Sequence, residues 1–157
     1  MSPIDVTALL SPTRTRINVP ARSRKRALEL AAELLASDGS GVATGLLFEQ
    51  LLTRERLGST GLGEGIAIPH CRIDCPHPRA ALLRLEAPVD FDAPDDTPVD
   101  LLFVLMVPPD ETSAHLTTLA ALARLFQSAD NRAALRAGQS DADLYATFVD
   151  LVRTGTT

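Results

Sequence analysis

The amino-acid sequence predicts an α/β domain in which helices pack on a sheet, and two observations carry that prediction. Short apolar runs typical of strands alternate along the chain with segments whose apolar residues recur at helical spacing. The run Leu-Leu-Phe-Val-Leu-Met-Val at 101–107 is apolar on both faces, as expected of a central strand that is covered on each side. With 157 residues the chain suits one domain, which we expect to span 1–157 with its core at about 5–152.

The first part of the chain is expected to contain a short strand and two helices. A lead-in segment with three prolines holds a candidate strand at 16–19. From Ser23 onward the apolar residues follow helical spacing, and Gly39 stands just past the end as a stop signal. A second helix is predicted over 45–56, with Thr44 as its N-cap.

The second part alternates strands with helices, and prolines and acidic residues mark the loops between them. A turn is expected between Cys71 and Pro78, where two prolines act as breakers. The expected strands cover 80–85, 89–91 and 101–107, and the expected helices cover 114–126 (with Ser113 as N-cap), 131–137 and 141–152.

The stretch 58–70 is the most informative segment for function. It holds four glycines within positions 58–65, then the apolar run 66–68, Pro69 and His70. Proline fixes its own φ and favours an extended residue before it, so the strand is expected to end there and hold His70 on a stiff mount. Because a neutral imidazole is a nucleophile and the free N–H groups of a Gly-rich turn bind phosphate oxygens, the stretch indicates a histidine that accepts a phosphoryl group. A core histidine hydrogen-bonded at a strand end is the alternative.

Two further side chains could complete such a site. His115 falls in the first turn of the helix predicted after the central strand, where the positive helix end disfavours a second positive charge. A neutral His115 could orient a partner imidazole or a phosphate, although a surface histidine that merely ends a helix has the same pattern. Arg54 lies in the last turn of the second predicted helix, from which it can hold phosphate oxygens. Phosphoryl transfer to this set requires no cofactor and no metal.

Composition argues against several classes of function. The formal net charge of −5 argues against a nucleic-acid binder, and no apolar run approaches the ~20 residues of a membrane-spanning helix, so we expect no membrane insertion. The N-terminal segment lacks a basic region followed by an apolar one, so we expect no export. Two cysteines are too few for a disulfide-built fold, which makes the cytoplasm the expected location.

A metal site is an alternative interpretation of the segment that follows His70. Cys71, Cys75 and His77 provide further thiolate and imidazole ligands within a short distance along the chain. These ligands would all come from one tight turn with two prolines, and no distant second pair accompanies them. We therefore favour small semi-buried cysteines and a solvated loop histidine.

Two clusters of charge are interpreted as solvated surface. Six of the fifteen basic residues gather near the N-terminus without interleaved aromatic residues, which favours a helix start with a role in partner docking over nucleic-acid contact. Seven acidic residues between positions 90 and 111 lack the spacing of a calcium loop and could help to select a basic partner surface. The basic cluster is Arg14, Arg16, Arg22, Arg24, Lys25 and Arg26, and the acidic cluster is Asp90, Asp92, Asp95, Asp96, Asp100, Asp110 and Glu111.

The segment from Glu55 to Cys71 resembles the phosphorylation-site pattern of a known family. The pattern is that of the enzyme IIA domains of the bacterial phosphoenolpyruvate-dependent phosphotransferase system, fructose/mannitol type, and Ile66-Ala67-Ile68-Pro69-His70-Cys71 is its centre. Within that family the chain looks most like the nitrogen-related enzyme IIA. The similarity covers about 5–150, with supporting segments at 23–29, 52–55, 98–103, 107–108 and 115–119.

The resemblance implies a mixed sheet flanked by helices, the phosphotransferase/anion-transport-like enzyme IIA fold. It also implies that a histidine-containing phosphocarrier protein phosphorylates His70 on Nε2. His115 matches the second active-site histidine, and Arg54 matches an arginine beside the phosphate. Cys71 stands where the family commonly has glycine, and it is expected to add an oxidisable thiol beside His70.

The nitrogen-related branch implies a phosphohistidine carrier with a regulatory role. Such a protein acts on partners in nitrogen and potassium homeostasis, for example components of potassium transport or sensor kinases, according to its phosphorylation state. Two alternatives stay open: a sugar-specific enzyme IIA subunit that passes phosphate to a transporter IIB domain, and a binding module that is never phosphorylated.

Overall fold

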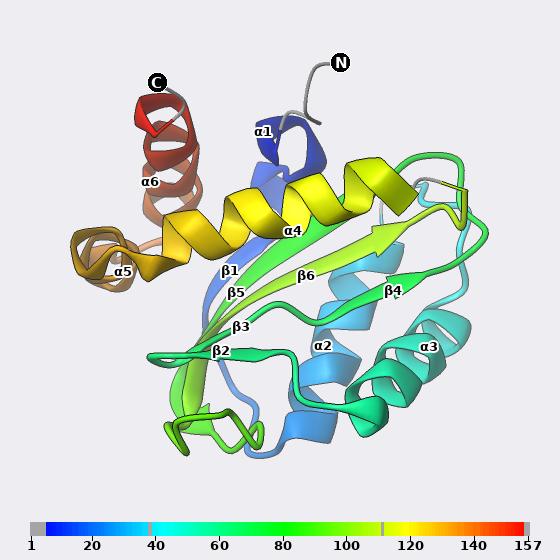
Figure 1. Cartoon of the computed structure of the whole chain (residues 1–157), viewed down its shortest axis with the longest axis horizontal. Coiled ribbons are helices and arrows are strands. Elements are labelled where there is room, and N and C mark those ends of the chain that lie inside the picture. The colour runs from blue at the N-terminus through cyan, green and yellow to red at the C-terminus, as the bar shows by residue number, and fades with distance from the viewer. Residues whose placement is uncertain (1–5, 38, 111, 156–157) are drawn as a thin grey trace.

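A six-stranded mixed sheet forms the middle layer of the molecule, with helices on both faces (Figure 1). The structure is a computed structural model that describes residues 6–37, 39–110 and 112–155. The strands are β1 (Thr15–Val19), β2 (Gly61–Gly63), β3 (Ile66–Ala67), β4 (His70–Arg72), β5 (Arg79–Val89) and β6 (Val99–Val107). The helices are α1 (Val6–Leu9), the 3-10 turn η1 (Pro12–Arg14), α2 (Arg24–Ala36), α3 (Thr44–Leu57), α4 (Thr112–Gln127), α5 (Ala129–Ala137) and α6 (Asp141–Thr154).

Strand β6 is the centre of the sheet. The strand order is β1-β5-β6-β3-β2, and β4 also pairs with β6 beyond the end of β3. β5 runs antiparallel to β6, whereas β3 and β4 run parallel to it. Nearly every residue of β6 is buried, which confirms the central strand predicted from the apolar run at 101–107.

Successive residues of β6 enter two separate hydrophobic cores, because side chains alternate between the faces of a strand. Leu102, Val104 and Met106 belong to the core under α2 and α3. Their neighbours Phe103 and Leu105 belong to the core formed with α1, α4, α5 and α6 on the opposite face. Figure 1 shows the same two helical layers on either side of the sheet.

Several predicted boundaries are wrong by one or a few residues. The N-cap of α3 is Ala43, and Thr44 is the first helical residue. Helix α4 starts at Thr112, which places Ser113 inside the first turn rather than at the N-cap. The predicted strands 80–85 and 89–91 are largely one strand, β5, whose register against β6 shifts between Arg84 and Val89.

The short elements α1, η1, β2 and β4 were not predicted, since three or four residues show no periodicity. By contrast, Ser23, Ser128 and Ser140 cap α2, α5 and α6 through side-chain oxygens that accept backbone N–H groups, which explains why these helices start where they do.

We expect Phe148→Ala to lower the free energy of unfolding by about 3–5 kcal/mol, because it leaves a cavity in a fully buried core. Phe148 of α6 stacks on Phe103 of β6 with ring centroids 5.2 Å apart, and both side chains are fully buried. Urea denaturation followed by circular dichroism measures the loss. The control is Leu46→Ala, since Leu46 is 54% exposed and its truncation is expected to change stability little. Equal losses in the two variants would contradict the assigned core.

Candidate functional site

The strand before Pro69 ends as predicted, and His70 opens a further strand, β4, that was not predicted. Strand β3 stops at Ala67, and β4 begins at His70 on the same side of β6, with His70 opposite Leu105. Between them the Pro69 carbonyl accepts a hydrogen bond from the Leu105 N–H at 2.9 Å. Proline lacks a donor but keeps its acceptor, so pairing with β6 resumes at once and His70 is fixed by the sheet.

One hydrogen bond determines which nitrogen of His70 carries the proton. The Nδ1 atom lies 2.7 Å from the Ile68 carbonyl oxygen. A carbonyl oxygen only accepts, so Nδ1 donates and the neutral ring has its unprotonated nitrogen at Nε2. Burial lowers the pKa of His70 below its ordinary value of 6.5, the bond to Ile68 opposes this, and the positive charge of Arg54 lowers it further. At neutral pH the ring is therefore uncharged.

His115 lies beside His70. The contact arises because β4, which carries His70, pairs with β6, and α4, which carries His115, follows β6 along the chain. The ring centroids are 5.2 Å apart and the ring planes are inclined by 52°. His115 is only 4% exposed, and burial, followed by the charges of His70 and Arg72, lowers its pKa to about 4. Its Nδ1 is buried without a hydrogen-bond partner in the described part of the chain. The ring is thus neutral at physiological pH.

Arg54 completes the grouping from the other wall of the same cleft. The cleft has a volume of about 380 Å³ and lies between the end of α3, strand β4 and the start of α4. The Arg54 guanidinium donates to the Gly58 carbonyl oxygen at 2.8 Å. The structure therefore brings together the three residues selected from the sequence. The lining residues are Gln50, Thr53, Arg54, Leu57, His70, Cys71, Arg72 and His115.

A buried carboxylate holds the end of α3, and with it Arg54, in place. Glu55 is 3% exposed, and its two carboxylate oxygens accept the Thr60 N–H at 2.9 Å and the Thr60 hydroxyl at 2.6 Å. A carboxylate that accepts two hydrogen bonds can stay buried at tolerable cost. The negative charge of Glu55 also raises the pKa of His70, against the effects of burial and Arg54.

The glycine-rich stretch does not provide the phosphate-binding amides that its composition indicated. Gly63 and Gly65 have φ values of 92° and 81° and form the turn between β2 and β3. A Cβ atom at Gly65 would lie 2.5 Å from the Arg136 guanidinium, so glycine is needed there for close packing. None of the glycines in this stretch lines the cleft, and the Glu64 N–H donates to Asp95. That prediction was wrong because a tight hairpin and an anion-binding turn demand the same residue.

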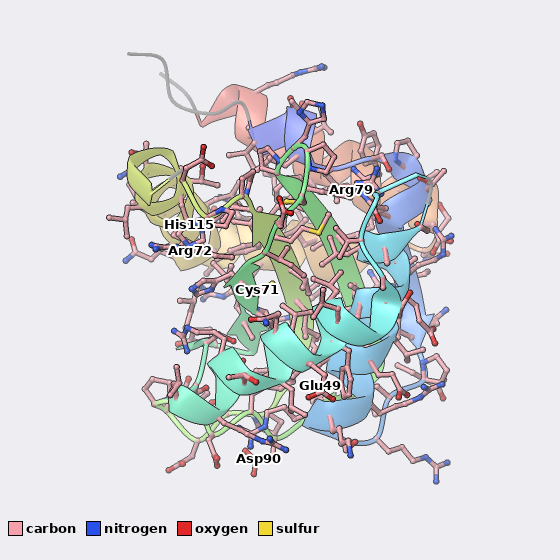
Figure 2. The ribbon with its side chains drawn as sticks, turned by 90° about the vertical axis from the view of Figure 1, so that its right-hand side faces the viewer. Glu49, Cys71, Arg72, Arg79, Asp90 and His115 are labelled. Carbon is pink, nitrogen blue, oxygen red and sulfur yellow. The ribbon has the colours of Figure 1, made fainter. Side chains whose placement is uncertain are left out.

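Arg72 is a site residue that the sequence interpretation missed. It follows His70 by two positions in β4, so both side chains project from the same face of the strand. Arg72 is exposed, and its charge lowers the pKa of both histidines. Figure 2 shows Arg72 next to His115, and Cys71 lines the same cleft. The alternation in His-Cys-Arg was the signal that could have revealed it.

Cys71 differs from the expectation of an oxidisable thiol beside His70. Cys71 is buried, and burial together with Cys75 raises the pKa of its thiol to about 12. Since the thiolate is the reactive form, the thiol is poorly placed for oxidation. No group of three or more His, Cys, Asp or Glu side chains in the described residues could hold a metal ion, so the zinc interpretation finds no support.

Fold and site together define the class of enzyme IIA proteins. The structure superposes on the nitrogen regulatory protein IIA-Ntr from Neisseria meningitidis with a TM-score of 0.85 and 37% identity, covering 90% of this chain and 97% of that one. The mannitol IIA of Escherichia coli shares the fold at a TM-score of 0.70 and 21% identity, covering 87% of this chain and 95% of that one.

The chain belongs to the family described as phosphoenolpyruvate-dependent sugar phosphotransferase system, EIIA 2, whose model matches residues 8–150. A nitrogen regulatory protein of Pseudomonas aeruginosa is 49% identical over 144 residues, which are 91% of this chain and 94% of that protein. The nitrogen regulatory protein of Escherichia coli K12 is 44% identical over 94% of this chain and 91% of its own length. No helix in the part of the chain that the structure describes is long and apolar enough to cross a membrane.

We expect His115 to make the protein less stable as the pH falls from 6.5 towards 4. The folded protein binds a proton on this ring only near pH 4, whereas the unfolded chain binds it near pH 6.5, so in between the unfolded state holds more protons. Below about pH 4 the resulting loss in the free energy of unfolding is on the order of 3 kcal/mol. Urea denaturation of wild type and His115→Gln at several pH values measures it. The variant should lose less stability than wild type over this range.

The control for this experiment is His77→Gln, which removes an exposed loop histidine. We expect it to reproduce the wild-type dependence on pH. Parallel curves for wild type and His115→Gln would show that the buried ring does not titrate in the way described.

Proposed function

We propose that this protein is a regulatory phosphohistidine carrier, in which His70 accepts a phosphoryl group from a histidine-containing phosphocarrier protein. The single observation that supports this most strongly is the hydrogen bond from His70 Nδ1 to the Ile68 carbonyl, because it leaves Nε2 with a free lone pair. That ring borders a cleft that also holds Arg54 and a second neutral imidazole, that of His115.

In the proposed step, the Nε2 lone pair of His70 attacks the phosphorus of the donor phosphohistidine in line. The bond between phosphorus and Nε2 forms while the bond to the donor imidazole breaks, and the donor nitrogen leaves with the bonding electron pair. The His70 ring becomes positively charged as it gains the phosphoryl group, and the Ile68 carbonyl stabilises this charge through the Nδ1 proton. No covalent chemistry beyond this exchange is needed.

The neighbouring side chains have distinct proposed roles. The Arg54 guanidinium can bind two phosphoryl oxygens, since Arg presents donors in a fork that matches them. His115 donates a hydrogen bond to a third phosphoryl oxygen. Arg72 adds a further positive charge at the open edge of the cleft. A neutral His115 suits this role, because a positively charged His115 ring would repel the positive charge that develops on the His70 ring.

The regulatory assignment follows the relatives named as nitrogen regulatory proteins. We propose that the phosphorylation state selects partner proteins in nitrogen and potassium homeostasis, and that the protein acts in the cytoplasm. A sugar-transport role is the second candidate, because a fructose-specific EIIA component of Haloferax volcanii is 30% identical over 97% of this chain and 99% of that protein.

Phosphorus NMR tests the acceptor. We expect incubation with phosphoenolpyruvate, enzyme I and the phosphocarrier protein to yield an acid-labile phosphoramidate on wild type and none on His70→Ala. Adding a sugar-type IIB domain then separates the two candidates, since rapid transfer to its cysteine would favour the transport role. A wild-type protein that stays unphosphorylated while a positive control is loaded would falsify the carrier proposal.

The role of Arg54 has a matched control within the same helical turn. Arg54→Gln is expected to slow loading by about tenfold to a thousandfold, because removing one donor to a developing anion has an effect of that order. Arg56→Gln removes the same charge from a residue that does not line the cleft, and it should leave the rate close to that of wild type. Equal rates for the two variants would remove Arg54 from the site. Quench-flow measurement of phosphorylated protein against time gives both rates.

A further inference from the structure

A second cleft lies on the other side of the last turn of α3. It has a volume of about 500 Å³, within the range of small-molecule sites, and lies between the start of α2, the end of α3 and the segment after β5. Arg54 faces the His70 cleft, whereas Arg56, two residues further on, lines this one. The lining residues are Arg22, Ser23, Arg24, Lys25, Leu52, Glu55, Arg56, Asp90 and Asp92.

The acidic groups of this cleft are already bound within the protein. The Glu55 carboxylate accepts both hydrogen bonds from Thr60. Asp92 forms an ion pair with Arg24 at 3.5 Å. Asp90 accepts the Asp92 N–H at 2.8 Å, which holds the turn after β5.

Three cations of the same cleft have no such partner. Arg22, Lys25 and Arg56 form no ion pair or side-chain hydrogen bond with the residues that the structure describes. The start of α2, a helix of 13 residues, adds the positive end of its dipole. The lining carries four cationic and three acidic side chains, so its formal charge is positive by one, and its three cations without a partner among the described residues lie on one concave surface. Arg22 and Lys25, two members of the basic cluster near the N-terminus, thus have a place in the structure beyond solvation.

We propose that this cleft binds a small phosphorylated molecule through Arg22, Lys25 and Arg56. The guanidinium groups match phosphoryl oxygens in geometry, and the ammonium group of Lys25 adds a point charge. The half-buried side chain of Leu52 lines the cleft and offers an apolar contact for the organic part of such a ligand. Binding here requires neither His70 nor the transfer step proposed above.

Pyrophosphate is the probe that tests the site, with inorganic phosphate as a weaker second probe. Amide chemical shifts in ¹⁵N-labelled full-length protein are followed during titration. We expect saturable shifts at 22–25 and at Arg56, and the same shifts in His70→Ala. The variant Arg22→Gln/Lys25→Gln/Arg56→Gln should weaken this binding by at least about tenfold, and added salt should weaken it in wild type.

The matched control is Arg26→Gln, which removes a positive charge from the same helix end outside the cleft. Arg26 pairs with Glu29 instead of lining the cleft. The control should bind pyrophosphate within about twofold of wild type, as expected of an exposed charge that makes no direct contact. Shifts that do not saturate, shifts confined to the His70 cleft, or equal weakening in the triple variant and the control would each overturn the proposal.

Phosphate groups also occur on lipid headgroups, so a second arm separates the sources. Sedimentation with vesicles containing phosphatidylglycerol should leave the protein in the supernatant. Vesicle binding that the triple variant abolishes would overturn a site for a small soluble ligand. Failure of the carrier proposal appears separately, as absence of phosphoramidate on His70, and leaves the pyrophosphate result unaffected.

Discussion

Pairing along β6 fixes where the functional side chains lie. β3 and β4 occupy the same side of this strand, and the short break between them places His70 opposite Leu105. The chain that leaves the end of β6 enters α4, which carries His115 in its first turns. His70 and His115 are 45 positions apart in sequence, yet their rings are adjacent. They meet because β6 pairs with the strand that carries His70 and leads into the helix that carries His115. The third component, Arg54, reaches the site from the helix that packs beneath the same sheet.

The electrostatics of the site follow from burial in the presence of cations. Two imidazoles are withdrawn from water next to Arg54 and Arg72, and both factors favour their neutral forms. Two influences oppose this at His70: the hydrogen bond to the Ile68 carbonyl, which is the larger, and the carboxylate of Glu55, which is buried and bonded to Thr60. The result is a cleft with fixed positive charge and two uncharged nitrogen bases. Such a cleft suits an incoming anion better than an incoming cation.

Much of this arrangement could be predicted from the sequence, and the reasons for success and failure are physical. The burial of β6 appears in the sequence as a run of apolar residues, and the start of α2 appears as the capping residue Ser23. Both patterns lie within a short stretch of sequence, so both elements could be predicted. β2 and β4 have three residues each and are strands only because β3 and β6 lie alongside them. The role of Arg72 depends on that pairing, because the alternation in His-Cys-Arg places Arg72 beside His70 only if the segment is a strand.

The glycines near Gly65 illustrate a different limit. Their backbone conformations were correctly expected to be special, but the reason is contact with Arg136 and Asp100 rather than contact with a ligand. The tautomer of His70 likewise could not be predicted from the sequence, because it depends on the position of the Ile68 carbonyl oxygen.

The alternation of β6 between two cores has a consequence for how this sequence can change over time. Deleting one residue near the start of β6 would move each later side chain of the strand to the opposite face of the sheet. Phe103 would then point towards α2 and Leu102 towards α6. The contacts of β3, β4 and β5 would shift with it, and the two histidines would no longer face each other. A change of length in β6 is therefore expected to disturb the fold more than a conservative substitution within it.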